Sequence, residues 1–119
     1  MKRTVIVTGG TKGLGREIAL AFARNGCFVV SLYASDVSVS REFDAILAER
    51  GLEGISVKHD VCSETPPDWN HAAIQGADHL TWVHNACAAF VPAPMHQLTW
   101  RDFENNHLVA VKGAWVCSQ

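Results

Sequence analysis

The chain has 119 residues, which is enough for one domain with a hydrophobic core and too few for two domains of ordinary size. Hydrophobic residues make up 48% of it and the formal net charge is −2, so it lacks the strong positive charge of proteins that bind nucleic acid or anionic membranes. We expect a single globular domain over residues 1–119, with neither kind of partner.

Targeting, membrane insertion and metal binding find no support in the residue pattern. No segment approaches the roughly 18 to 20 apolar residues that span a bilayer, and the first apolar run, Thr4–Thr8, is too short for a signal peptide. The 4 cysteines form no CxxC pair and lie at no metal-ligand spacing from a histidine. We expect a cytoplasmic protein with reduced, buried thiols, no metal site, and histidines and tryptophans in structural roles.

Apolar segments of strand length alternate with segments of helical period, which is the pattern of repeated βαβ units. In chain order the sequence predicts a strand at Thr4–Thr8, a helix at Leu14–Asn25, a strand at Cys27–Tyr33, a helix from about Ser40 to Arg50 and a strand at Gly54–Lys58. The expected buried faces are Leu14, Ile18, Ala21 and Phe22 in the first helix and Phe43, Ile46 and Leu47 in the second.

The second half of the chain continues the alternation. Thr65–Asp68 predicts the start of a helix, with threonine as the N-cap, proline at the first helical position and an acid after it, and Gly76 predicts its end. His79–His84 has the composition of a fourth strand. A similar capping pattern at Thr99–Asp102 predicts a last helix that runs to the end of the chain.

Strands alternating with helices favour a parallel sheet with right-handed crossovers. The expected fold class is therefore α/β, a Rossmann-type doubly wound parallel sheet with strand order 3-2-1-4. In such a sheet the ligand crevice lies beside strands 1 and 4, at their carboxyl ends.

A glycine-rich turn, Thr8–Gly15, joins the first strand to the first helix. Gly9 permits a tight turn, Gly13 lets the backbone approach phosphates, and Gly15 allows close packing of helix on strand. The free N–H groups and positive end of the helix then suit the pyrophosphate of a dinucleotide. The spacing is G-x-x-x-G-x-G, which is neither G-x-G-x-x-G nor the Walker pattern. A turn that binds no phosphate, or a domain that binds S-adenosylmethionine or flavin, is the alternative.

This glycine spacing resembles that of the classical short-chain dehydrogenases/reductases. Asp60-Val61 is similar to the family pair whose carboxylate accepts a hydrogen bond from the adenine amino group. His84–Cys87 resembles the family's Asn-Asn-Ala-Gly element, and matches it at Asn85 and Ala86 only. The cofactor-binding residues that the resemblance implies are Gly9, Thr11, Lys12, Gly13, Leu14, Gly15, Ser35, Asp60, Val61, Asn85 and Ala86.

The choice of cofactor depends on the end of the second strand, where an acid would bind the ribose 2′-hydroxyl of NAD. Tyr33 occupies that position here. Lys12, just before Gly13, resembles the basic residue of NADP-preferring members, and Ser35 could donate to a 2′-phosphate. These residues favour NADP, and Asp36 is the counter-evidence that would favour NAD.

The family's catalytic groups are an active-site serine and a Tyr-x-x-x-Lys motif, and neither can be placed in this chain. Its one tyrosine is Tyr33, it ends at Gln119, and Ala110 stands where the resemblance expects a catalytic asparagine. We therefore expect no catalytic residue in the chain itself.

The resemblance implies an NADP-dependent oxidoreductase that transfers hydride between the cofactor and a carbonyl or alcohol substrate, for example a 3-oxoacyl-carrier-protein reductase. The chain would be its truncated cofactor-binding half. The alternative is a non-catalytic NAD(P)-binding sensor or partner subunit. Either protein is expected to form a homo-oligomer or to pair with another subunit.

Overall fold

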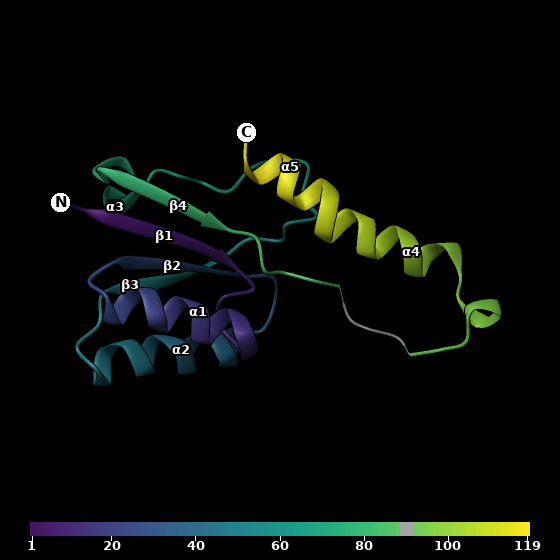
Figure 1. Cartoon of the computed structure of the whole chain (residues 1–119), viewed down its shortest axis with the longest axis horizontal. Coiled ribbons are helices and arrows are strands. Elements are labelled where there is room, and N and C mark those ends of the chain that lie inside the picture. Colours follow the sequence, from purple (N-terminus) through teal and green to yellow (C-terminus); the bar gives the residue numbers. More distant parts are fainter. Residues whose placement is uncertain (89–91) are drawn as a thin grey trace.

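A four-stranded sheet forms the centre of the computed structural model, which describes residues 1–88 and 92–119 (Figure 1). The strands are β1 (Arg3–Thr8), β2 (Phe28–Tyr33), β3 (Gly54–Lys58) and β4 (His79–Val83). All neighbouring pairs are parallel and the order is β3-β2-β1-β4. The predicted α/β fold and strand order are therefore confirmed.

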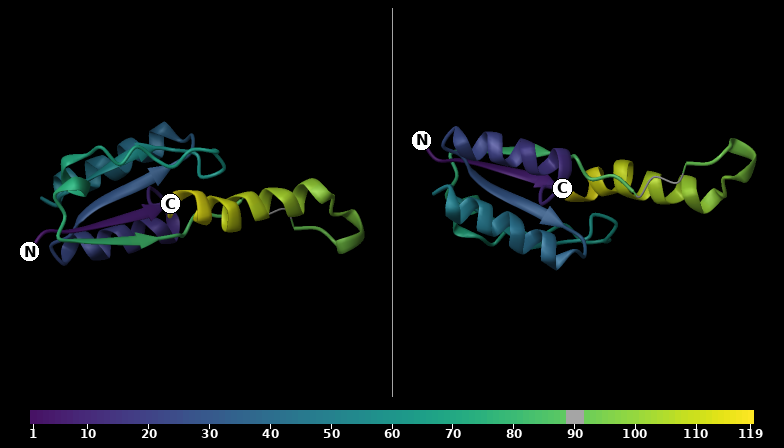
Figure 2. Two further views of the ribbon diagram at one scale, coloured as in Figure 1. Left: turned by 90° about the horizontal axis from the view of Figure 1, so that it is seen from above. Right: turned by 90° about the horizontal axis from the view of Figure 1, so that it is seen from below.

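Helices α1 (Gly13–Arg24) and α2 (Val37–Glu49) cover one side of this sheet, which we call the α1–α2 face (Figure 2). Alternate strand residues point to this side because successive side chains of a strand face opposite ways. The resulting core consists of Val5, Val7, Ala19, Leu20, Ala23, Cys27, Val29, Phe43 and Leu47.

The buried side of α1 differs from the predicted one. Leu14 is 70% exposed and Ala21 is also exposed, whereas Ile18 and Phe22 are only partly buried. The fully buried residues of α1 are Gly15, Ala19, Leu20 and Ala23. Small residues on this side let the helix axis approach the sheet closely, so periodicity that counts only large apolar residues predicts the wrong rotation.

Helix α2 begins at Val37, earlier than the predicted start near Ser40. Asp36 is its N-cap, and the Asp36 carboxylate accepts hydrogen bonds from the backbone N–H of Val39 and the hydroxyl of Ser38. An aspartate at this position satisfies an N–H group that has no partner within the helix. Asp36 is therefore a structural residue of α2 as well as a candidate for the cofactor site.

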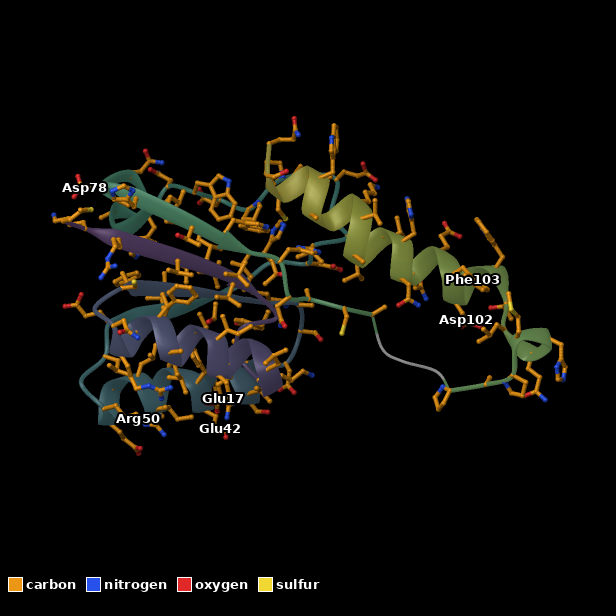
Figure 3. The ribbon with its side chains drawn as sticks, viewed as in Figure 1. Glu17, Glu42, Arg50, Asp78, Asp102 and Phe103 are labelled. Carbon is orange, nitrogen blue, oxygen red and sulfur yellow. The ribbon has the colours of Figure 1, made fainter. Side chains whose placement is uncertain are left out.

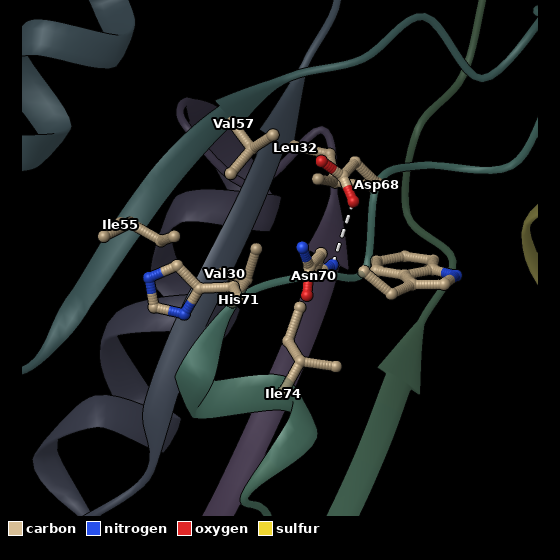
Figure 4. A pocket seen from close by; sticks show the side chains of 9 residues that line it. Val30, Leu32, Ile55, Val57, Asp68, Asn70, His71 and Ile74 are labelled. Atoms are coloured by element: carbon tan, nitrogen blue, oxygen red, sulfur yellow. Dashed lines mark hydrogen bonds between the residues drawn. The ribbon is translucent and has the colours of Figure 1, made fainter.

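The opposite side of the sheet, which we call the α3 face, lacks the helix predicted to start at Thr65–Asp68. Only α3 (Ala72–Gln75) forms, with His71 as its N-cap. The Thr65 hydroxyl lies 3.1 Å from that of Ser63, and the Asp68 carboxylate accepts from the Asn70 N–H at 2.9 Å (Figure 4). These local turns compete with helix formation. The predicted end at Gly76 is correct.

The α3 face is covered less completely than the α1–α2 face. A cavity of about 200 Å³ lies between β2, β3 and the segment before α3, and its lining includes Val30, Leu32, Ile55 and Val57 (Figure 4). A second cavity of about 500 Å³ lies between Trp69, Trp82 and the carboxyl end of the chain. This side of the sheet is therefore partly open.

The carboxyl-terminal helix extends away from the sheet (Figures 1 and 2). It consists of α4 (Trp100–His107), the π turn η2 (Leu108–Lys112) and α5 (Gly113–Cys117). The predicted capping box is present, because the Thr99 hydroxyl accepts from the Asp102 N–H and the Asp102 carboxylate from the Thr99 N–H. The π turn was not predicted. In the described part of the chain, no helix is long and apolar enough to cross a membrane.

Candidate cofactor site

A cavity of about 560 Å³ opens at the carboxyl ends of the parallel strands. Its walls come from the turn after β1 and from the segments that follow β2, β3 and β4. The lining residues are Gly9, Thr11, Lys12, Leu14, Leu32, Tyr33, Ala34, Ser35, Asp36, His59, Val61, Asn85, Ala86 and Cys87. Eight of the residues proposed from the sequence are in this set, namely Gly9, Thr11, Lys12, Leu14, Ser35, Val61, Asn85 and Ala86.

The glycine turn is compact on one side and open on the other. Gly9 has φ +63°, and a Cβ on Gly15 would lie 2.1 Å from the Gly9 carbonyl oxygen. Gly13 has φ +56°, but a Cβ there would meet nothing within 4 Å. Gly9 and Gly15 therefore hold the turn against α1, while Gly13 faces open space, as expected where phosphates approach the backbone.

Gly10 is a further constraint that the sequence reasoning missed. A Cβ on Gly10 would lie 2.6 Å from the Ser31 hydroxyl oxygen and 2.9 Å from the Val7 carbonyl oxygen. In the sequence, Gly10 is only one more glycine in a glycine-rich turn, so the pattern does not show that this position is constrained. The structure shows that Gly10 must lack a side chain because β2 passes beneath it.

The N-terminus of α1 is suited to an anion. Among the described residues no side chain caps this helix, and its first turn carries no acidic residue. The first N–H groups of a helix lack intrahelical partners and carry a partial positive charge. The exposed Lys12 adds a full positive charge at the same place.

Asn85 holds the loop after β4 against the end of β1. Its backbone N–H and that of Ala86 donate to the Thr8 hydroxyl at 2.9 and 3.0 Å. The Asn85 amide nitrogen donates to the carbonyl oxygens of Thr8 and Gly9 at 3.2 and 3.3 Å. Thr8 is thus a site residue that glycine spacing alone did not reveal, because its buried hydroxyl fixes two walls of the cavity.

Two residues at the end of β2 give opposite indications about the cofactor. Ser35 lines the cavity with an exposed hydroxyl group, and Asp36 lines it with a carboxylate. The hydrogen bond from Ser38, together with that from Val39, lowers the pKa of Asp36, and Lys12 contributes by its charge. Asp36 is therefore anionic in the same cavity that Lys12 lines.

The segment after β3 brings His59 and Val61 to the cavity, whereas Asp60 between them is not part of the lining. The Asp60 carboxylate instead accepts from the Cys62 N–H at 2.9 Å. Among the described residues, the buried Nε2 atom of His59 has no hydrogen-bond partner. Burial lowers the pKa of His59, opposed by the charge of Asp60. No signal in the sequence singled out His59.

The cysteines are free thiols, and the expectation that they are buried holds for two of them. Cys27 and Cys117 are buried, Cys62 is partly buried and Cys87 is exposed. Cys87 follows β4 in the loop that lines the cavity, where side chains reach solvent. Burial raises the pKa of Cys117 and, with Asp60 nearby, that of Cys62.

Among the residues that the structure describes, the site contains groups that can hold a dinucleotide, and none is placed to transfer a proton by the family's motif. Tyr33 lies at the end of β2. Ala110 is exposed on the π turn, and the side chain of Asn106 donates to the Asp102 carbonyl oxygen one turn earlier in the helix. The structure therefore gives no reason to assign to Asn106 the role of the catalytic asparagine that the resemblance expects at Ala110.

Comparison with known proteins identifies the family. The family model described as short chain dehydrogenase matches residues 3–119. Glucose 1-dehydrogenase 2 of Bacillus subtilis is 40% identical, over 96% of this chain and 45% of that protein. A putative short-chain alcohol dehydrogenase from Sinorhizobium meliloti has a TM-score of 0.81 and 27% identity, covering 100% of this chain and 48% of that chain.

A metagenomic short-chain oxidoreductase solved in complex with NADP shares the fold, with a TM-score of 0.76 and 20% identity over 96% of this chain and 52% of that chain. The chain therefore spans about half the length of the proteins it matches. The matched residues include the glycine turn, all four strands and the carboxyl-terminal helix. The chain belongs to the short-chain dehydrogenase family.

Proposed function

We propose that this chain binds NADP(H) in the 560 Å³ cavity and forms the cofactor-binding part of a short-chain oxidoreductase acting on a carbonyl or alcohol. The observation that carries the proposal is the open side of Gly13 at the uncapped start of α1, with Lys12 beside it. Steric space, backbone N–H groups and positive charge coincide there, which is what a pyrophosphate requires.

Each wall of the cavity has a proposed role. The N–H groups at the start of α1, from Gly13 to Gly15, would hold the pyrophosphate. Lys12 and Ser35 would hold the 2′-phosphate of the adenosine ribose. When bound, the nicotinamide group supplies the hydride, and Asn85 and Ala86 would orient it from the loop after β4. The free cysteines fit a reducing cytoplasm, where we place the protein.

The choice of NADP is tested by calorimetry with NADPH and NADH. We expect wild type to bind NADPH more tightly, because a dianionic phosphate gains charge-assisted hydrogen bonds from Lys12. Lys12→Ala should reduce this preference by roughly tenfold. Lys58→Ala, an exposed lysine outside the cavity lining, is the matched control. Equal binding of both dinucleotides by wild type would refute the role proposed for Lys12.

The site itself is tested by two glycine substitutions with similar chemistry. Gly15→Ala places a Cβ against the Gly9 carbonyl and should abolish dinucleotide binding, because the turn cannot close on α1. Gly51→Ala is the control: Gly51 has φ +62° and lies in open space after α2, away from the cavity lining, so binding should be kept although the backbone of the variant is strained locally. Binding that survives Gly15→Ala would place the dinucleotide elsewhere.

A non-catalytic dinucleotide sensor or partner subunit is the second candidate. Ala110 favours it, because the resemblance expects an asparagine there. The discriminating measurement is NADPH oxidation by the chain in the presence of carbonyl substrates. Turnover at ordinary rates would exclude the sensor. NADPH binding without turnover fits both candidates, and the reading frame after Gln119 then separates them, because a serine and a Tyr-x-x-x-Lys further on would support the oxidoreductase.

We also propose that the carboxyl-terminal helix pairs with the same helix of a second copy. Trp100, Phe103, Val111 and Trp115 are exposed and recur at helical spacing, while Gly113, Val116 and Cys117 are buried against the rest of the domain. Figure 3 shows Phe103 on α4, far from the sheet. A helix that is apolar on two sides is typically buried on both.

The exposed area is sufficient for a symmetric pair. The four side chains expose roughly 500 Å² together, so self-association would bury about 1,000 Å², the lower end for a specific interface. We expect a dimer by light scattering, and a monomer for Trp115→Glu. Met95→Glu, an exposed apolar residue before the helix, is the control and should stay dimeric. A monomeric wild type would refute this assembly.

A further inference from the structure

The imidazole of His84 connects three parts of the molecule. Its Nδ1 atom lies 3.4 Å from the Thr8 hydroxyl at the end of β1, and its Nε2 atom lies 3.1 Å from the Val109 carbonyl oxygen in the π turn. The ring also stacks on Trp82, with centroids 6.3 Å apart and planes 18° apart. His84 is therefore held between the cofactor wall and the carboxyl-terminal helix.

The partners determine which nitrogen of the ring carries the proton. The Val109 carbonyl oxygen can only accept, so Nε2 must donate. The Thr8 hydroxyl oxygen already accepts from the N–H groups of Asn85 and Ala86, so its own hydrogen is free to be donated to Nδ1. The geometry therefore favours the tautomer with the proton on Nε2.

The bond from His84 coincides with the break in helical hydrogen bonding. In an uninterrupted α-helix the N–H of Gly113 would donate to the Val109 carbonyl, four residues earlier. Here the Gly113 N–H donates to the Leu108 carbonyl, which is the five-residue step of a π turn. The Val109 carbonyl, which Gly113 does not use, accepts a hydrogen bond from His84. Side chains that insert into a helical ladder in this way are a known cause of such distortions.

We propose that His84 is a positioning residue that fixes the π turn η2 and joins it, through Thr8, to the loop of Asn85 and Ala86. The chain of bonds runs from the Val109 carbonyl to the imidazole, then to the Thr8 hydroxyl, and then to the backbone of two residues that line the cofactor cavity. The functional part of this inference rests on the proposed binding of NADP(H) there.

The structural part is tested on the free protein by ¹⁵N NMR of the histidine side chains. We expect His84 to show the neutral tautomer with the proton on Nε2. The other tautomer, or an equal mixture of both, would overturn the assignment. This measurement uses the wild-type chain, so it does not depend on whether any variant folds.

Two variants separate the bonds of His84. His84→Gln can place an amide N–H near the position of Nε2, whereas His84→Asn reaches only as far as Nδ1. We expect His84→Gln to keep the wild-type rates of hydrogen exchange at the amides of Gly113 and Ala114. His84→Asn should change these rates, because the Gly113 N–H would return to the Val109 carbonyl. His96→Gln, an exposed histidine before α4, is the control. Unchanged exchange in His84→Asn would refute the positioning role.

The coupling to the cofactor is measured by NADPH affinity. Loss of a hydrogen bond that orders the cavity wall should weaken binding about tenfold in His84→Asn, with most of the affinity retained in His84→Gln. If wild type binds no NADPH but has the expected tautomer and exchange, the proposed function fails and the positioning role stands. If wild type binds NADPH and His84→Asn binds it equally well, the coupling is refuted and the proposed function stands.

Discussion

The two faces of the sheet are made from the same strands yet differ in packing. On the α1–α2 face, Val5, Val7 and Val29 lie under two helices of 12 and 13 residues, and Phe43 is 0% exposed. On the α3 face the buried strand residues lie under a helix of 4 residues and beside two cavities. The buried strand residues of the α3 face are Ile6, Val30 and Leu32.

The difference in packing comes from the segments that cover each face and not from the strands. Alternation supplies apolar side chains to both faces equally. A long helix can follow a strand along its length, whereas one helical turn and an irregular segment leave gaps that Trp69 and Trp82 fill only in part. Packing density, and therefore the response to substitution, should differ between the faces.

The largest expected effect is the loss of a core side chain from the α1–α2 face. Phe43→Ala should lower the free energy of unfolding by about 3–5 kcal/mol, because the packed surroundings cannot fill the space. Trp69→Ala on the α3 face should cost less, since that side chain is only partly buried. Urea unfolding of both variants gives the comparison. Equal losses would show that the two faces contribute alike.

Enlarged side chains should have opposite consequences on the two faces. Ala19→Leu inserts atoms where α1 contacts the sheet at 0% exposure and should destabilise by about 1–3 kcal/mol. Ile74→Phe adds volume beside the 200 Å³ cavity and should be neutral or stabilising. Thermal unfolding detects both changes. Destabilisation by Ile74→Phe similar to that of Ala19→Leu would mean that the α3 face has no usable space.

Two buried serines distinguish a satisfied hydroxyl from an unsatisfied one within the α1–α2 side of the molecule. The Ser40 hydroxyl donates to the Val37 carbonyl at 2.8 Å, so Ser40→Ala should cost about 1 kcal/mol. The buried Ser31 hydroxyl has no partner among the described residues, so Ser31→Ala should be neutral or slightly stabilising. A clear loss of stability in Ser31→Ala would indicate an undetected partner for Ser31, such as an ordered water.

The smallest expected effect is the pH dependence contributed by His59. Burial lowers its pKa below the ordinary value of 6.5, so on acidification the unfolded chain takes up this proton before the folded protein does. The contribution of His59 to the free energy of unfolding is therefore complete above about pH 6.5. It is lost as the pH falls toward the lower pKa that His59 has in the folded state.

Unfolding midpoints in urea at neutral and mildly acidic pH test this effect. His59→Gln should reduce the loss of stability on acidification, whereas the control His96→Gln should leave it unchanged. If His59→Gln and wild type respond identically to pH, burial of His59 does not contribute to the acid sensitivity of the fold.

Much of the fold and of the candidate site followed from local signals. The strand order, the capping box at Thr99 and the position of the glycine turn were predicted correctly, because each depends on neighbouring residues or on a general rule of chain crossover. The helix at Thr65 was wrong although its capping pattern was similar, since its threonine and aspartate bond within local turns instead. Similar capping patterns therefore began a helix at Thr99 and local turns at Thr65.

The sequence by itself determined the alternation of strands and helices, the fold class and the place of the glycine turn at the carboxyl end of β1, because these arise from periodicity and backbone freedom. Only the tertiary structure decided the rotation of α1, the burial of Ser31 and His59 and the π turn opposite His84. These features depend on contacts between residues far apart in the chain, such as Gly10 with Ser31 and His84 with Val109. Local pattern carries no information about such contacts.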